Sequence, residues 1–210
     1  MAKYIRASCR LCRREGIKLF LKGTKCTTDK CPVAKRTYAP GQHGKGKIRR
    51  KESNYGLQLR EKQKVKRMYG VLERQFKHYF RTAERAKGVT GLTLLQLLER
   101  RLDNVIFRMN IASSRAGARQ IVYHGFVRVN NRKVDIPSYT VKPGDEITLK
   151  VKEPMVKRLM ETRELIKDRL IPKWLEVDDK ELKAKIKDLP TKEDIGFPIQ
   201  EQLIVELYSK

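Results

Sequence analysis

Apolar and polar positions alternate most regularly between residues 91 and 151 of the chain. From Leu94 to Met109 the apolar side chains recur every three or four residues, which is the period of a helix with one buried face. Ser113 or Ser114 can cap a second helix over residues 115–124. The first half of this region is therefore predicted to be helical.

Shorter alternating segments follow these two helices. Residues 126–129, 132–136 and 147–151 alternate in polarity, which predicts three strands. Asn130 and Asn131 suit a two-residue hairpin turn, because asparagine tolerates positive φ. The pattern thus predicts two helices followed by a small antiparallel sheet.

Two further helices are predicted before this region. Residues 71–87 place their aromatic side chains on one helical face, which is more typical of a core than of base stacking. Residues 57–69 are rich in helix formers but poor in apolar side chains. We therefore expect one broad face of the segment 57–69 to be basic and exposed, lined by Arg60, Lys62, Lys64, Lys66 and Arg67.

The C-terminal segment has a weaker pattern. Residues 155–170 predict an amphipathic helix with Leu159, Ile166 and Leu170 facing inward. Residues 172–177 read as a packed loop anchored by Trp174. Residues 199–208 have the apolar density needed to dock on the helices of residues 55–90.

The charge of the chain indicates the class of molecule that the protein binds. The chain carries a formal net charge of +25, well beyond what solubility requires. Residues 1–50 contain fifteen basic and two acidic side chains, whereas residues 151–210 contain thirteen of each. No apolar run approaches the ~20 residues that a membrane span needs. The predicted partner is a polyanion, and nucleic acid is favoured over a membrane surface.

The four cysteines form two close pairs, Cys9-x2-Cys12 and Cys26-x4-Cys31, separated by thirteen residues. This spacing lets one loop fold back around a tetrahedral ion, and four protein ligands make such a site structural. Nearby arginines and lysines are expected to lower the thiol pKa values. The pattern favours one structural zinc ion over an iron–sulfur site or over redox-active or inert thiols. His43 lies in a turn-like Pro-Gly-Gln-His-Gly stretch and is expected not to be a ligand.

A basic stretch, KGKIRRK, occupies residues 45–51. Its glycine spacing and single apolar residue predict an adaptable phosphate-binding segment, the alternative being a solvated tract without a particular target. Its candidate RNA-binding residues are Lys45, Lys47, Arg49, Arg50 and Lys51.

The series SRAGARQIVYHGFVRVN, followed by PSY and PGDEI, is similar to the RNA-binding module named after protein four of the small ribosomal subunit. Pseudouridine synthases, tyrosyl-tRNA synthetases and heat-shock RNA-binding proteins share that module. The resemblance implies that the helix over residues 114–124 and the hairpin after it face RNA. The residues that it points to are Arg115, Arg119, Gln120, Arg128, Arg132 and Lys133, with both helix arginines expected on the outside.

The resemblance extends over the whole chain. APGQHGKGK, YGLQLREKQKVKRMYGVLERQF, LLERRLDNVIFRMN and the terminal IQEQLIVELYSK resemble the bacterial-type S-four family, in its cysteine-containing, zinc-binding branch. This implies a cytoplasmic structural protein of the small subunit that binds 16S rRNA first and nucleates assembly. The resemblance also implies contact with small-subunit protein five, an influence on translational accuracy, and messenger RNA near residues 45–51.

These observations together predict an α+β fold. A zinc knuckle and basic arm would span residues 1–50, and a helical domain residues 51–90, completed by residues 196–210. The RNA-binding domain would span residues 91–195, with the S-four-type module at about 99–160.

Two other functions remain open at this stage. The protein could be a translational regulator that binds its own messenger, or an RNA-modifying enzyme that uses the module for targeting. No pair of carboxylates or nucleophile–base pair has the spacing of a catalytic site, so no enzymatic activity is expected.

Overall fold

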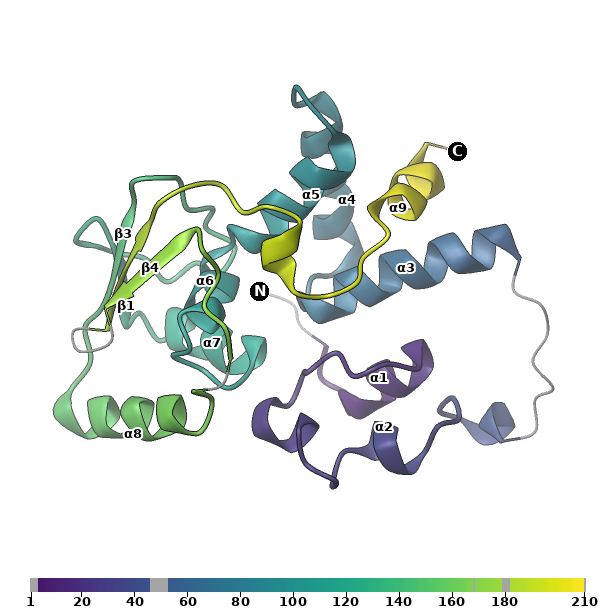
Figure 1. Cartoon of the computed structure of the whole chain (residues 1–210), viewed down its shortest axis with the longest axis horizontal. Helices are drawn as coiled ribbons and strands as arrows, with labels where there is room; N and C mark the ends of the chain where they lie inside the picture. Colours follow the sequence, from purple (N-terminus) through teal and green to yellow (C-terminus); the bar gives the residue numbers. More distant parts are fainter. Residues whose placement is uncertain (1–3, 46–52, 168, 179–181, 210) are drawn as a thin grey trace. The chain divides into compact units, whose positions relative to one another are not determined.

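The computed structural model describes residues 4–45, 53–167, 169–178 and 182–209. Its contacts divide the chain into two compact units, residues 1–93 with 198–210 and residues 94–197. Helices predominate in the first unit, and the second combines helices with a small antiparallel sheet (Figure 1). The predicted α+β class is thereby confirmed. None of the helices in the described part is both long and apolar enough to cross a membrane.

The first unit begins with short elements around the cysteines. Two of them are short α-helices, α1 (Cys9–Glu15) and α2 (Pro32–Lys35), and two are 3-10 turns, η1 (Gly23–Cys26) and η2 (Gln42–Gly44). Gly16 follows α1 in the left-handed region, with φ 72°, a conformation that ends the helix and reverses the direction of the chain.

Longer helices form the rest of the first unit. They are α3 (Asn54–Met68), α4 (Glu73–Arg85) and the C-terminal α9 (Glu201–Tyr208). The predicted aromatic face of α4 is buried, and Phe76 and Phe80 lie 6.3 and 4.5 Å, ring to ring, from Tyr208 of α9. The last residues of the chain therefore pack on helices formed more than a hundred residues earlier.

The helix α5 (Thr90–Glu99) runs across the boundary between the two units. In the second unit, α6 (Leu102–Arg108) and α7 (Arg115–Tyr123) pack against each other. Ser114 caps α7 by accepting a hydrogen bond of 3.2 Å from the Gly117 amide, as the sequence predicts.

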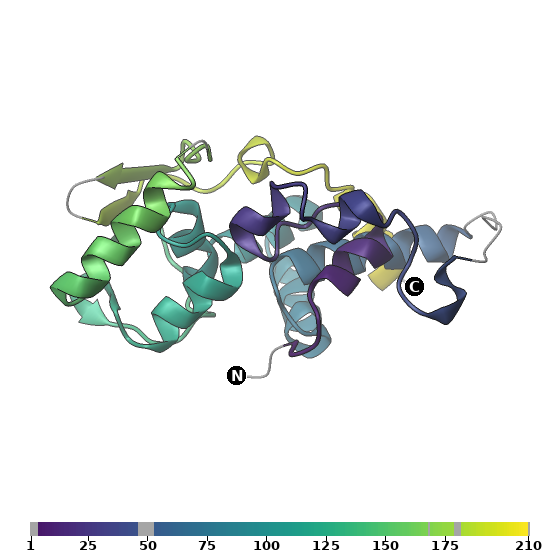
Figure 2. The same cartoon turned by 90° about the horizontal axis from the view of Figure 1, so that it is seen from below.

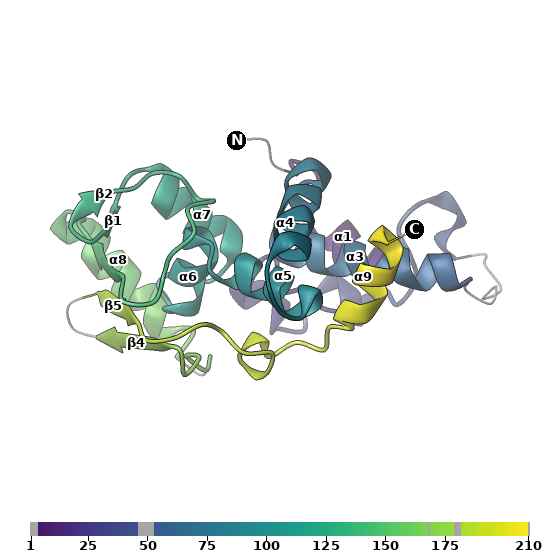
Figure 3. The same cartoon turned by 90° about the horizontal axis from the view of Figure 1, so that it is seen from above.

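The sheet of the second unit has the order β2-β1-β3-β5-β4, and all its pairs are antiparallel. Figure 3 labels the strands β1 and β2 and, farther along the sheet, β5 and β4. Its strands are β1 (Val127–Val129), β2 (Arg132–Lys133), β3 (Glu146–Leu149), β4 (Leu175–Asp178) and β5 (Lys183–Ile186). Asn130 and Asn131 have φ values of 49° and 64°, which confirms the predicted hairpin turn. Val127, Val129 and Ile147 turn inward onto α6 and α7.

Two predictions for the C-terminal part are wrong. The helix α8 (Glu153–Glu164; green in Figure 2) ends before the expected residue 170, so Leu170 leaves the helical register and is 88% exposed. Residues 175–177, expected in a loop, belong to β4, because β5 supplies a hydrogen-bonding partner that local sequence does not reveal. Leu159, Ile166 and Trp174 are buried as predicted, and a 3-10 turn, η3 (Glu193–Ile195), precedes the return to the first unit.

Candidate RNA-binding surface and cysteine site

The four cysteines come from three short elements and line one pocket. Cys9 and Cys12 lie on α1, Cys26 ends η1, and Cys31 precedes α2. All except Cys9 are buried, and the Lys22 amide donates a hydrogen bond of 3.3 Å to the Cys26 sulfur. The structure thus brings all four predicted ligands together, although within its described residues no group of three or more His, Cys, Asp or Glu side chains has the arrangement of a metal site. His43 is exposed on η2 and does not line the pocket.

The thiols of Cys12 and Cys26 do not have the lowered pKa values that the basic sequence predicts. Burial raises the pKa of Cys12, although a backbone hydrogen bond from Leu19 lowers it in part, and burial also raises the pKa of Cys26. Arg13, one of the expected neighbours, instead donates hydrogen bonds of 3.1 and 3.2 Å to the carbonyl oxygen of Tyr38. A basic residue close to a cysteine in the sequence therefore need not place its charge beside the thiol.

The expected exposed basic face of α3 is also wrong. Lys62, Lys64 and Arg67 expose 12%, 14% and 20% of their side chains, and each has an acidic partner in the first unit. Arg60 and Arg67 pair with Glu15 of α1, Lys62 pairs with Glu73 of α4, and Lys64 pairs with Glu61. Neighbouring elements cover this face, which the pattern of one isolated helix cannot reveal.

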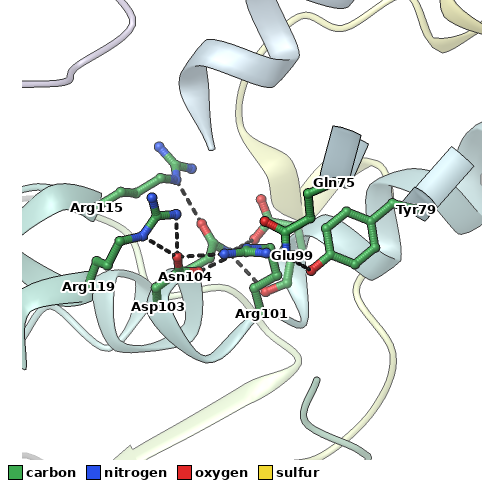
Figure 4. A network of polar contacts seen from close by, with 8 residues as sticks. All are labelled: Gln75, Tyr79, Glu99, Arg101, Asp103, Asn104, Arg115 and Arg119. Carbon is green, nitrogen blue, oxygen red and sulfur yellow. Dashed lines mark hydrogen bonds and ion pairs between the residues drawn. The ribbon is translucent and has the colours of Figure 1, made fainter. Parts of the chain in front are cut away.

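The helix α7 carries its two arginines against α6 (Figure 4). Arg119 Nη2 lies 2.6 Å from Asp103 Oδ2, and the Arg115 Nε–H donates a hydrogen bond of 2.8 Å to Asn104 Oδ1. Both arginines are half-buried, so their expected position fully on the outside is wrong. Their guanidinium groups are instead held in fixed directions at the edge of the helix pair.

Two buried carboxylates stabilise this arrangement. Asp103 also accepts from Arg101, whose side chain is 0% exposed, at 2.8 Å. Glu99 accepts hydrogen bonds of 2.7 Å from Arg108 and from Asn104. Buried charges of this kind need opposite charges and hydrogen bonds to offset their desolvation. Sequence reasoning did not single out Glu99, Asp103 and Asn104, and the only available signal was their polarity inside an apolar helical run.

The hairpin after α7 presents the more accessible candidates. Arg128 and Lys133 are cross-strand partners and therefore share one face of the sheet. Arg128 donates to Asn131 Oδ1 at 3.3 Å, whereas Arg132, Lys133 and the α7 residue Gln120 are exposed. Lys133 crosses Gly125, where an added Cβ would lie 2.3 Å from its Cε. Residues of α7 and the hairpin thus lie together as predicted.

The basic arm is described only at its first candidate. Lys45 is exposed, and its ammonium nitrogen lies 5.5 Å from the centre of the Tyr38 ring. Lys47, Arg49, Arg50 and Lys51 lie outside the described residues.

Comparisons with known proteins match the chain over almost its whole sequence. Residues 3–99 match the ribosomal protein S4/S9 N-terminal domain, and residues 100–147 match the S4 domain. Small ribosomal subunit protein uS4 of Acetivibrio thermocellus is 58% identical over 210 residues, covering 100% of both chains. The chain belongs to the uS4 family. The uS4 proteins of Natranaerobius thermophilus and Geotalea daltonii are 55% and 58% identical, again over 100% of both chains.

Membership of the uS4 family confirms the structural ribosomal role that the sequence predicts. The uS4 family is one of ribosomal proteins, which generally have no enzymatic activity. The matched S4 domain contains α6, α7 and the hairpin, and so includes all six candidates of that region.

Proposed function

We propose that the protein binds 16S rRNA directly and early in assembly, as a structural component of the small ribosomal subunit in the cytoplasm. The observation that supports this most is the surface of α7 and the β1–β2 hairpin within the matched S4 domain. It combines the fixed guanidinium groups of Arg115 and Arg119 with the exposed Arg132 and Lys133. Guanidinium groups held by hydrogen bonds, together with exposed cations in the same domain, suit the phosphates of a folded RNA.

Binding of this kind depends on phosphate neutralisation and RNA shape. Each neutralised phosphate releases counterions, so log K should fall by about 0.7–0.9 per unit of log salt for each contact. Arg128 and Gln120 would add hydrogen bonds to phosphate or sugar oxygens beside the charged contacts. The protein would therefore contact mainly the sugar-phosphate backbone of the RNA rather than the edges of its bases.

The test is charge reversal in the hairpin, Arg132→Glu together with Lys133→Glu. Both side chains are exposed, so the fold should be retained. Affinity for 16S rRNA should fall by roughly ten- to a hundredfold, and the salt slope by about 1.5, as two phosphate contacts are lost. Filter binding over a salt series measures both quantities.

A matched control reverses two exposed lysines elsewhere in the second unit, Lys152→Glu and Lys157→Glu. It changes the net charge by the same amount and should have the smaller effect. Equal losses for the two double variants would remove the hairpin from the binding surface. Arg119→Glu is unsuitable for this test, because it would place a carboxylate against the buried Asp103.

Other RNA contacts are proposed for the first unit. Lys45, Lys47, Arg49, Arg50 and Lys51 would bind ribosomal RNA and also messenger RNA. Arg60, Lys62, Lys64 and Arg67 would contact RNA at their exposed edges while keeping their acidic partners. Contact with small-subunit protein five would account for an influence on translational accuracy, and no catalytic role is assigned.

We further propose that Cys9, Cys12, Cys26 and Cys31 bind one structural zinc ion. Their convergence on one pocket supports this, as does the burial of three of the four thiols. Four thiolates are a common structural zinc set, and binding would require loss of the thiol protons. The ion would hold α1, η1 and α2 together, since these elements contain only 7, 4 and 4 residues.

A further inference from the structure

A pair of arginines lies against the ring of Phe107 in the second unit. Phe107 belongs to α6 and is 5% exposed. The Cζ atoms of Arg115 and Arg169 lie 4.4 and 4.1 Å from the centre of its ring. Arg115 begins α7, whereas Arg169 follows α8, so residues 54 positions apart converge at one aromatic side chain.

Arg169 is held by neutral groups. Its guanidinium donates to the carbonyl oxygens of Phe107, Ala112 and Ser113 at 3.4, 3.2 and 3.0 Å. Among the described residues it has no carboxylate partner, unlike Arg108 and Arg119, which bind Glu99 and Asp103. The guanidinium has five N–H groups, and three contacts leave donors available.

The charge of Arg169 is also unfavourably placed in the isolated protein. Burial lowers its pKa, and repulsion from Arg115 and Arg108 adds to this, giving a value of about 10. The three carbonyl oxygens satisfy part of the guanidinium but supply no formal negative charge against its burial. An anion at this place would offset both the burial and the repulsion.

The surrounding backbone favours the same kind of ligand. The contact with the Ser113 carbonyl places the Arg169 guanidinium beside the N-terminal end of α7, a helix of 9 residues. The helix dipole is positive at that end and favours negative charge. Arg115 contributes a second guanidinium, directed by Asn104.

We propose that Arg169 and Arg115 form a binding site for a backbone phosphate of the RNA, an inference that rests on the proposed RNA-binding function. Arg169 lies outside the segment that matches the S4 domain, residues 100–147, and so extends the binding surface to the segment after α8. The carbonyl contacts set the direction of the guanidinium before RNA arrives, which reduces the entropy lost on binding.

The test compares Arg169→Gln with Arg100→Gln in binding to 16S rRNA over a salt series. Arg100 is a matched control, since it is half-buried and donates to the Val141 carbonyl oxygen at 2.8 Å, but has Asp145 nearby. Arg169→Gln should lower the salt slope by about 0.7–0.9 and the affinity by roughly tenfold. Arg100→Gln should leave the slope unchanged.

The phosphate site would be overturned if Arg169→Gln kept the wild-type salt slope and lost affinity only because the variant is less stable to heat. Arg169 would then be a purely structural arginine. If wild-type protein does not bind 16S rRNA, the proposed function itself fails. These two failures are therefore distinguishable.

Chemical modification of the wild-type protein makes the test independent of whether Arg169→Gln folds. Phenylglyoxal reacts with accessible guanidinium groups, and mass spectrometry identifies the modified arginines. Bound 16S rRNA should protect Arg169 and Arg115 while leaving Arg100 as reactive as before. Modification of Arg169 at the same rate with and without RNA would contradict the proposal.

Discussion

Glu73 is a single residue on which three elements of the first unit meet. Its carboxylate accepts hydrogen bonds of 2.8 Å from Lys62 and Lys66 of α3 and of 2.9 Å from the hydroxyl of Tyr208 in α9. Burial by itself would raise the pKa of Glu73, but these three hydrogen bonds outweigh it and lower the pKa to about 2. The same contact raises the pKa of Tyr208, after the larger effect of burial.

The pKa of Glu73 predicts a dependence of stability on pH. Because its folded-state value lies below the ordinary value of 4.5, the unfolded chain binds more protons between these limits. The contribution of Glu73 to the free energy of unfolding should be complete above about pH 4.5 and should be lost as the pH falls through about 2. Urea unfolding of the wild type and Glu73→Gln at several pH values measures this, as the difference between the two should shrink on acidification. A difference that stays constant from pH 7 to pH 3 would contradict the assignment.

At the scale of elements, the short segments around the cysteines depend most on the proposed zinc. The helices α1 and α2 contain 7 and 4 residues, too short to be stable alone. One docking contact to the rest of the unit is the buried Glu15, which pairs with Arg60 and Arg67 of α3. Metal binding and this ion pair would act together to hold the segment.

Removal of zinc should therefore unfold residues 4–45 selectively. Structural zinc supplies on the order of 10 kcal/mol to small domains. Metal analysis should find about one zinc per chain. A chelator should make the lysines and arginines of this segment sensitive to trypsin. Cys26→Ser should behave like the chelated protein, whereas a metal-free protein with full protection would disprove the site.

Elements with a local signal could be predicted from the sequence. The amphipathic α4, the cap of α7 at Ser114 and the Asn130-Asn131 turn all follow from residues within a few positions of each other. The strands β4 and β5 could not, because β5 pairs both with β4 and with the distant β3, and both strands carry charged side chains on their exposed face.

The candidate site was predictable only in part, for a related reason. The positions of Arg115 and Arg119 on one helix follow from a spacing of four residues. Their directions depend on Asp103 and Asn104 of α6, and the location of Arg169 depends on the path of the chain after α8. Interactions across elements are not encoded in any single hydrophobic pattern.

At the scale of the whole molecule, the first unit is discontinuous in sequence. Residues 1–93 and 198–210 belong to it, with residues 94–197 forming the second unit in between. The side-chain amide of Gln58 in α3 donates a hydrogen bond of 2.8 Å to the Glu206 carboxylate, and the backbone N–H of Gln200 donates one of the same length to the Glu61 carboxylate. The helix α9 thus covers α3 through both apolar and polar contacts.

Deletion of residues 198–210 should loosen the first unit and spare the second. The deletion uncovers Phe76 and Phe80, so a dye that binds exposed apolar surface should fluoresce more strongly. Hydrogen exchange should quicken in α3 and α4 while α6 and α7 stay protected. Deletion of residues 209–210 alone is the control, and a truncated chain with unchanged exchange in α3 would refute this dependence.

The return of α9 to the first unit also affects the order of events during synthesis. Translation makes α3 and α4 more than a hundred residues before α9, the helix that covers them. A nascent chain would therefore carry an unfinished first unit until α9 has emerged, with the aromatic face of α4 uncovered although all residues of the second unit have already been made.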